Sequence, residues 1–352
     1  MTYIGIDFHK KYSVASSVDE SGRIVKEGRI EGNTKAGFER YFGSLGFPCK
    51  VVIEACWNWG YIFDLLEDIP QVQEVILANP YKTRIIAEAQ IKTDKIDART
   101  LAQLLRAGLI PQAHIPSQPV RQRKNILRQR QYWVRMRTKL RNRVHALLDR
   151  QRGLEMPQVT DLFGSKGKAA LKVARLPEPD RDLLGQDLEV LNALDKQIRE
   201  NENYLREESG EDIELLESIP GIGRVLSQVI SAEIDEIGRF PTSAKLCAYA
   251  GLVPTTHSSG GKEYHGKLLS KCNKWLRWAF VEAAWVAVGC SPYFGSLYRH
   301  YRSLGKPGNK TIMIAARRMC QIVWRVLSEK KPYEERMFLE NNPGCSQSRL
   351  AV

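Results

Sequence analysis

The hydrophobic and polar positions divide the chain into a strand-rich first third and a helix-rich remainder. Short segments rich in Val and Ile, separated by turn residues or helical stretches, predict strands at TYIGID, YSVASSV, RIVKEGRI, KVVIEAC and EVILANP. Helical spacing predicts helices at Lys35–Leu45 and Trp59–Leu66. The order three strands, helix, strand, helix, strand, helix predicts an α/β domain over residues 1–116, with an antiparallel meander at its start.

Two stretches in the middle of the chain have heptad-like apolar spacing and predict long helices, at Arg121–Arg152 and Glu178–Glu217. They carry opposite net charge and are joined by a link containing Gly and Pro, so they form either an antiparallel pair or an exchange between subunits. We therefore expect a coiled-coil region over residues 117–212. The predicted seam residues are Ile126, Trp133, Met136, Leu140 and Leu147 in the first helix, and Leu184, Leu188, Leu191, Ile198 and Leu205 in the second.

The chain after Glu217 is predicted to be mainly helical. A Gly-rich polar loop is expected over Pro254–Gly266, followed by helices around Lys271–Val288 and Thr311–Leu327. This pattern predicts a C-terminal domain at 213–331 and a polar tail at 332–352.

The charge of the chain indicates what kind of partner it binds. Among 352 residues, 53 Lys and Arg against 40 Asp and Glu give a net charge of +13, which favours a polyanionic partner such as nucleic acid. The first long helix holds twelve Lys or Arg and one acid, whereas the second holds fourteen acids and four bases. A solvated helix face is the alternative for the basic stretch, but its imbalance favours nucleic-acid contact by residues such as Arg130, Arg137, Lys139 and Arg141.

Composition also excludes several classes of protein. The longest apolar run, Trp278–Cys290, contains an acid and is shorter than the ~20 residues of a membrane span. The N-terminus has no signal-peptide pattern, so a cytoplasmic location without a membrane partner is expected. Seven scattered Cys without a CxxC pair indicate neither a disulfide framework nor a thiolate zinc site.

Four carboxylates are candidates for one metal site. Asp7 and Glu54 stand at the ends of the first and fourth predicted strands, which converge in an α/β sheet. Asp94 and Asp97 are three residues apart at a predicted helix start and therefore share one face. Such a cluster repels itself unless cations neutralise it, and its oxygen ligands suit Mg²⁺ or Mn²⁺. Two such ions would activate an attacking oxygen and stabilise a leaving one.

Each acid alone has another explanation, since Asp94 and Asp97 could simply cap a helix. An acid on strand one, an acid on strand four and a pair after strand five are together the ribonuclease-H-like arrangement. Sugar kinases and actin share that fold but need small residues after the first Asp, where this chain has Phe8 and His9. A kinase is therefore not expected.

A second candidate site is a serine loop, in which Ser258 and Ser259 precede Gly260 and Gly261. A hydroxyl beside glycines and cations suits attack on a phosphodiester, although such loops are usually exposed turns. The neighbouring cations expected to contact nucleic acid are Lys262, Lys271, Lys274 and Arg277.

The segment Pro220–Gly223, with sequence PGIG, lies between two apolar helical stretches and predicts a helix-hairpin-helix turn. Backbone N–H groups near Gly221 and Gly223 would then receive a phosphate without reading base sequence. A tight helix connection is the alternative.

Six blocks together resemble the DEDD transposases of the insertion-sequence one-hundred-and-ten family and the related site-specific DNA invertases. These blocks cover nearly the whole chain: GIDFHK, VVIEA, ANPYKTRIIAEAQIKTDKIDARTLAQLL, LLESIPGIG, RFPTSAKLCAYAGLVPTTHSSGGK and LSKCNKWLRWAFVEAAW. The resemblance implies a RuvC-like N-terminal domain whose four acids are Asp7, Glu54, Asp94 and Asp97. It also implies a C-terminal transposase domain whose nucleophile precedes a glycine, which is Ser259, with Ser258 as its neighbouring alternative.

The same resemblance implies that the serine joins covalently to DNA and that both domains complete one composite site, often between subunits of a dimer or tetramer. It further implies a structured noncoding guide RNA that pairs with donor and target DNA. The prediction is a Mg²⁺-dependent serine recombinase that moves an insertion element. Two alternatives stay open: a Holliday-junction-type nuclease in which water attacks, and a non-catalytic nucleic-acid-binding protein.

Overall fold

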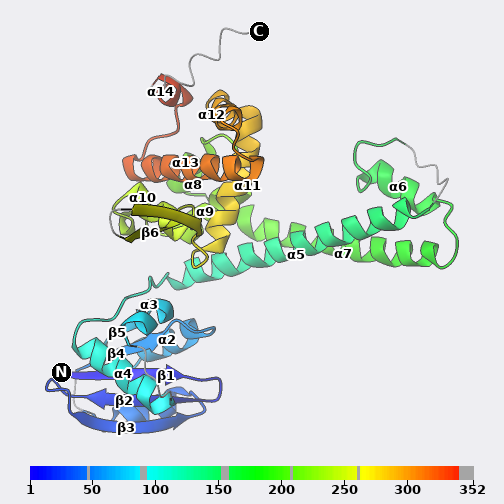
Figure 1. Cartoon of the computed structure of the whole chain (residues 1–352). Helices are drawn as coiled ribbons and strands as arrows, with labels where there is room; N and C mark the ends of the chain where they lie inside the picture. Colours follow the sequence, from blue (N-terminus) through cyan, green and yellow to red (C-terminus); the bar gives the residue numbers. More distant parts are fainter. Residues whose placement is uncertain (46–47, 88–92, 152–157, 207–208, 260–261, 341–352) are drawn as a thin grey trace. The chain divides into compact units, whose positions relative to one another are not determined.

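The computed structural model describes the chain except residues 46–47, 88–92, 152–157, 207–208, 260–261 and 341–352, and the side chains of 257–259, 262, 263, 265 and 340 (Figure 1). It separates into two compact units, Met1–Pro116 and Ser117–Val352. Each unit has hydrophobic core clusters of its own.

The first unit is built on a five-stranded mixed sheet of order β3-β2-β1-β4-β5. Strands β1 and β2 and strands β2 and β3 pair antiparallel, whereas β1, β4 and β5 run parallel. The predicted strands and the antiparallel meander are confirmed. Their bounds are β1 Thr2–Phe8, β2 Tyr12–Val18, β3 Ile24–Glu31, β4 Cys49–Glu54 and β5 Val72–Ala78.

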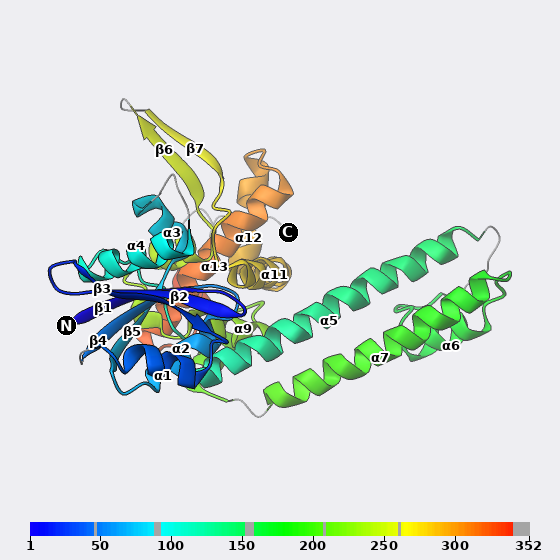
Figure 2. The same cartoon turned by 90° about the horizontal axis from the view of Figure 1, so that it is seen from below.

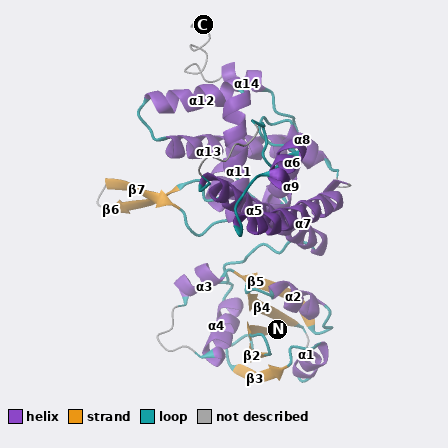
Figure 3. Cartoon of the chain, turned by 90° about the vertical axis from the view of Figure 1, so that its right-hand side faces the viewer, coloured by secondary structure: helices purple, strands orange, loops and turns teal. Residues whose placement is uncertain are grey.

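Helices cover both faces of this sheet (Figure 3). On one face, α1 (Lys35–Phe42) and α2 (Trp59–Glu67) bury the larger core cluster. On the other face, α4 (Asp94–Arg106) packs against β1, β2 and β4, and α3 (Pro80–Ile86) precedes it in the chain. The absence of a side chain at Gly5 permits this packing, because a Cβ there would lie 2.1 Å from the carbonyl oxygen of Ala98 in α4.

The second unit begins with two long helices, α5 (Gln118–Asp149) and α7 (Asp180–Arg206), which run antiparallel and side by side within the chain (Figure 2). The shorter α6 (Ser165–Val173) lies in the segment between them. A separate core cluster occupies the end of the pair near α6 and includes Val144, Leu147, Phe163, Leu171, Leu184 and Leu191.

The predicted seam is buried along all of α7 and only partly along α5. All five predicted α7 positions are buried. In α5, Leu147 is buried, Ile126 and Leu140 are half-buried and pack against core clusters, and Met136 is 36% exposed. The α5 side chains that are buried instead include Lys124 and Gln131. Lys124 is buried beside Glu233 of α9, as described below.

The rest of the second unit is a helical bundle with a large apolar core. None of the described helices combines the length and apolar character required to cross a bilayer. The bundle contains α8 Glu211–Glu217, α9 Arg224–Ile234, the 3-10 turn η1 Ile237–Arg239, α10 Ser243–Tyr249, α11 Lys274–Cys290, α12 Pro292–Ser303, α13 Gly308–Glu329 and α14 Glu335–Glu340.

The segment predicted as a Gly-rich loop is instead a two-stranded antiparallel ribbon. It consists of β6 (Pro254–Ser259) and β7 (Lys262–Leu268) and projects from the helices around it (Figures 2 and 3). The expectation was wrong because Gly and Ser content outweighed Thr255, Thr256 and Tyr264, whose side chains favour strands.

Candidate active site

Two of the predicted acids end neighbouring parallel strands. Ile6 of β1 pairs with Ile53 of β4, so Asp7 and Glu54 are the next residues along the two strands. Side chains in register on parallel strands share a face, and Asp7 shares its face with Gly5, against which α4 packs. The acids therefore project toward the α4 side of the sheet.

The other two acids open helix α4. Thr93 caps this helix by accepting a hydrogen bond from the backbone N–H of Ile96, and Asp94 and Asp97 occupy the first turn. The helix N-terminus stabilises both carboxylates through its partial positive charge. Because α4 packs on β1, its acidic first turn lies close to Asp7.

A histidine joins two of these acids. The Nε2 atom of His9 lies 3.1 Å from Oδ2 of Asp7 and 3.1 Å from Oδ2 of Asp94. The Tyr12 hydroxyl donates a hydrogen bond of 2.9 Å to Oδ2 of Asp94, and the His9 and Tyr12 ring centroids are 4.7 Å apart. The guanidinium carbon of Arg29 lies 3.7 Å from the Tyr12 ring centroid, a cation–π contact with this phenol.

Burial and electrostatic repulsion both raise the pKa of Asp7. Burial raises its pKa above the ordinary value, and the charges of Asp94 and Asp97 raise it further, while His9 opposes them. The cluster therefore carries more negative charge than its protein neighbours neutralise.

The site fits a divalent cation. Asp7, His9 and Asp94 each offer one ligand atom, and these atoms lie within 4.8 Å of one another among the described residues. Two carboxylates suit Mg²⁺ or Mn²⁺, and an imidazole is also accepted by transition metals. Asp97 reaches this group electrostatically and Glu54 ends the adjacent strand, but neither belongs to the three ligand atoms.

The sequence prediction missed His9 as a member of the site. It follows Asp7 by two residues, and that spacing along a strand places side chains on the same face. This spacing was the available signal.

Two family profiles of transposases match the chain. A DEDD transposase profile matches residues 4–151, and a profile described as Transposase IS116/IS110/IS902 family matches residues 213–299. The chain belongs to the IS116/IS110/IS902 family of transposases. Its mixed sheet with a mainly helical remainder fits a RuvC-like DEDD domain, and such a domain depends on a divalent metal.

Two relatives of this transposase match nearly the whole chain, and a third matches part of it. A probable family 20 transposase of Pseudomonas aeruginosa is 25% identical over 95% of this chain and 98% of its own length. The transposase for insertion sequence element IS1111A of Coxiella burnetii is 25% identical over 94% of this chain and 90% of its own length. The pilin gene-inverting protein of Moraxella bovis is 29% identical over 35% of this chain and 39% of its own length.

The second candidate site of the transposase lies on the ribbon. The Ser258 backbone pairs with Glu263 and that of Ser259 with Lys262, but the side chains of Ser258, Ser259 and Lys262 lie outside the described residues.

The base of the ribbon is held firmly. The Leu269 N–H donates to the Val253 carbonyl at 3.1 Å. Arg277, predicted to contact nucleic acid, donates to the backbone carbonyls of Ala250, Gly251 and Leu269, which lie on both sides of the ribbon. Its guanidinium is therefore engaged in the fold.

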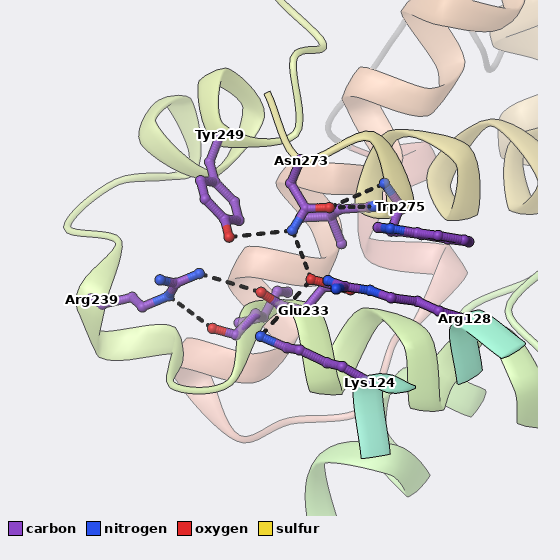
Figure 4. A network of polar contacts seen from close by, with 9 residues as sticks. Lys124, Arg128, Glu233, Arg239, Tyr249, Asn273 and Trp275 are labelled. Atoms are coloured by element: carbon purple, nitrogen blue, oxygen red, sulfur yellow. Dashed lines mark hydrogen bonds and ion pairs between the residues drawn. The ribbon is translucent and has the colours of Figure 1, made fainter. Parts of the chain in front are cut away.

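A buried carboxylate lies beneath this region (Figure 4). The Glu233 side chain is 5% exposed and accepts a 2.7 Å hydrogen bond from Arg128, and Lys124 lies 3.9 Å away. Asn273 donates to Glu233 at 2.8 Å and, through its own oxygen, caps the first turn of α11 at Trp275. Glu233 thus links α5, α9 and α11.

The cations predicted on α5 have mixed surroundings. Arg130 forms an ion pair with Glu202 of α7 at 2.5 Å, and Arg137 forms one with Asp195 at 3.2 Å. For these two, the acidic helix is the partner in this structure, because each guanidinium faces a carboxylate across the seam. Arg141 lies over the Phe163 ring, with its guanidinium carbon 4.9 Å from the centroid. Lys139, like Lys271 and Lys274 elsewhere, is exposed.

The predicted phosphate turn connects α8 to α9. Gly221 has a positive φ of +87°, and a Cβ there would lie 2.2 Å from the Ala283 carbonyl oxygen of α11. This glycine therefore serves a tight helix connection. Gly223 is the N-cap residue of α9, and a Cβ built there would meet nothing within 4 Å.

Proposed function

We propose that this transposase breaks and rejoins DNA strands to move an insertion element, with Mg²⁺ or Mn²⁺ at the acids and Ser259 as the nucleophile. The observation that carries the proposal is the convergence of Asp7 and Asp94 on His9 at the edge of the sheet. The strand order supports a ribonuclease-H-like fold for residues 1–116.

All four acids would contribute to the metal site. Asp7 and Asp94 would supply the described ligand atoms, while Glu54 and Asp97 add negative charge beside them. A bound divalent cation supplies charge neutralisation and Lewis acidity at a phosphate. Tyr12 and His9 hold Asp94 in place, so the carboxylate is preorganised for its ligand.

Ser259 would perform the covalent step. Its Oγ forms a bond to a DNA phosphorus, the bond from that phosphorus to one deoxyribose oxygen breaks, and the hydroxyl proton leaves to a base while the oxygen is protonated. The phosphoserine linkage conserves the phosphodiester energy, so reversal with another DNA hydroxyl rejoins strands without an external energy source. Ser259 is favoured over Ser258 because Gly260 follows it directly.

The remaining assignments concern partners and regions. Donor DNA, target DNA and a structured guide RNA would bind exposed cations, among them Lys139, Lys271 and Lys274, and the open start of α9 at Gly223 would receive a phosphate. Residues 117–212 would act as a coiled-coil region, 213–331 as the C-terminal transposase domain with a helix-hairpin-helix and 332–352 as a tail, in a dimer or tetramer.

Trapping the covalent intermediate tests the nucleophile. Incubation with a DNA substrate and Mg²⁺, followed by denaturation and mass spectrometry, should yield a nucleotide-modified peptide containing Ser259. The variant Ser259→Ala should bind DNA and give no adduct, whereas Ser258→Ala should retain it. Adduct formation by Ser259→Ala but not by Ser258→Ala would move the assignment by one residue.

A metal-dependent nuclease is the second candidate function. The described metal-compatible group contains no serine, and two carboxylates with an imidazole are sufficient to activate water. Metal-dependent strand cleavage by the Ser258→Ala/Ser259→Ala double variant, with no adduct and no rejoining in the parent protein, would establish it in place of the serine mechanism.

A further inference from the structure

One surface of the second unit combines cations with aromatic rings. Helix α5 and the first turn of α11 line an open groove. No acid belongs to its described lining, which consists of Asn125, Arg128, Gln129, Tyr132, Arg135 and Trp275. Arg128 and Arg135 place their guanidinium carbons 5.6 Å and 5.3 Å from the Trp275 ring centroid, and Tyr132 is 53% exposed.

The walls of this groove are preformed. Glu233 binds Arg128 from the α5 side and Asn273 from the α11 side, so one carboxylate fixes both walls (Figure 4). That carboxylate is 5% exposed and lies beneath the surface. Arg135 has no ion pair among the described residues, and it stays exposed beside the ring. The groove therefore presents positive charge and ring surface without having to rearrange.

We infer that this groove binds an unpaired segment of the substrate DNA. The guanidinium of Arg135 matches a phosphate, and the exposed ring of Tyr132 matches a base face, which is free for stacking only where a strand is unpaired. Charge complementarity with aromatic surface favours nucleic acid over an acidic peptide, which offers no planar bases to stack.

The connectivity favours DNA over RNA as the occupant. The ribbon that carries Ser258 and Ser259 continues through Asn273 into α11, and Trp275 lies in the first turn of that helix. Strand breakage opens DNA next to the reacting phosphodiester, so unpaired DNA is the ligand expected beside this ribbon. This inference rests on the proposed function, which makes DNA the substrate.

Binding of a fluorescent oligo-dT strand to the full-length protein tests the groove. The variant Tyr132→Ala should weaken this binding about 5- to 150-fold, the range for loss of one stacked base, and leave affinity for a blunt DNA duplex unchanged. Tyr132→Phe should bind like the parent, because the ring is kept. Tyr204→Ala, at an exposed tyrosine of α7 (72% exposed), is the matched control and should also bind like the parent.

A second variant keeps the test decisive if Tyr132→Ala lowers the melting temperature. Arg135→Gln should reduce the slope of log affinity against log salt for oligo-dT by about 0.7. Equal losses on oligo-dT and duplex, or unchanged oligo-dT binding in both variants, would overturn the inference. A loss confined to oligo-U RNA would overturn it too, since RNA would then be the occupant.

The two proposals fail separately. If Ser259 forms the adduct and Tyr132→Ala leaves oligo-dT binding intact, the groove assignment is wrong and the serine mechanism stands. If no adduct forms but Tyr132→Ala selectively weakens oligo-dT binding, the groove stands as a single-strand site and the serine mechanism is wrong.

Discussion

Two acidic centres of this transposase have opposite surroundings. Glu233 is almost fully buried and meets Lys124, Arg128 and Asn273. Asp7 is 25% exposed at its side chain and meets like charge from the first turn of α4, with His9 as its single described partner in an ion pair.

This difference separates a structural acid, Glu233, from the proposed metal ligand Asp7. At Glu233, cations and an amide balance the carboxylate, so its contacts stabilise the local packing of three helices. At Asp7, mutual repulsion works against folding, and the accessible sheet edge lets a cation relieve that repulsion. Mutual repulsion among carboxylates at an accessible site is therefore the better indicator of chemistry, and substitutions can separate the two roles.

The largest expected effect follows from Asp7→Asn. This change should reduce metal-dependent strand cleavage about 1,000-fold or more, because it removes ligand charge without changing shape. The melting temperature should stay level or rise, because one repelling charge is gone. Cleavage assays and thermal unfolding measure the two effects. Asp68→Asn, which affects only a surface pair with Lys35, is the control, and full cleavage by Asp7→Asn would refute the metal site.

Glu233→Ala should lower the stability of the protein, in contrast to Asp7→Asn. Removing one partner of a buried ion pair costs about 3–5 kcal/mol, because Lys124 and Arg128 lose their counter-charge. Urea unfolding should show this loss of stability. The double variant Glu233→Ala/Lys124→Met should recover part of it, since the deeply placed cation is then gone as well. Equal stability of Glu233→Ala and the parent would contradict a structural role.

Gly5→Ala should disturb the functional acids without altering any of them. The new Cβ would lie 2.1 Å from the Ala98 carbonyl oxygen, so α4 must move away from β1 and carry Asp94 with it. We expect a loss of about 1–3 kcal/mol in unfolding free energy and a marked fall in cleavage. Gly28→Ala is the control, because its Cβ would meet Tyr41 at an ordinary 3.6 Å. Unimpaired cleavage by Gly5→Ala would show that α4 does not position the acids.

The smallest effect concerns pH and the seam between α5 and α7. Burial alone would raise the pKa of Asp195, but hydrogen bonds from Lys168 and Arg137 outweigh burial and lower it. Because the folded pKa lies below the unfolded one, the stabilisation is full above the unfolded pKa, about 3.9, and is lost as pH falls through the folded pKa. Melting temperatures measured down to acidic pH should fall less steeply for Asp195→Asn than for the parent. Glu189→Gln, at an exposed acid of the same helix, should follow the parent curve.

Strand and helix patterns predicted most of the first unit. Period-two and helical spacing are local properties, so the sequence places Asp7 and Glu54 at strand ends and Asp94 at a helix start. The contribution of His9 was not predicted, because it depends on how closely α4 approaches β1. That approach is a tertiary effect of Gly5.

The second unit was predicted less well where charge and apolar pattern compete. The charge imbalance of the first long helix predicts nucleic-acid contact by Arg130 and Arg137, whereas in the structure both form ion pairs with acids of α7. Arg277 similarly appeared to be a surface cation, but it binds backbone carbonyls at the base of the ribbon. Both outcomes depend on partners far away in the sequence, which local patterns do not contain.

The ion pairs between α5 and α7 also fix how the two helices are aligned along their length. Arg130, Arg137 and Arg143 meet Glu202, Asp195 and Asp187 in turn, so steps along one helix are matched by nearly equal steps back along the other. Sliding one helix by a single turn would separate all three ion pairs. Removing seven residues from each helix, in contrast, would keep the remaining charges opposite one another. Such a paired deletion would shorten the helix pair by about 10 Å and keep the alignment of its two helices. The length of the α5–α7 pair can therefore vary in whole heptads without redesign of the ion pairs between the two helices.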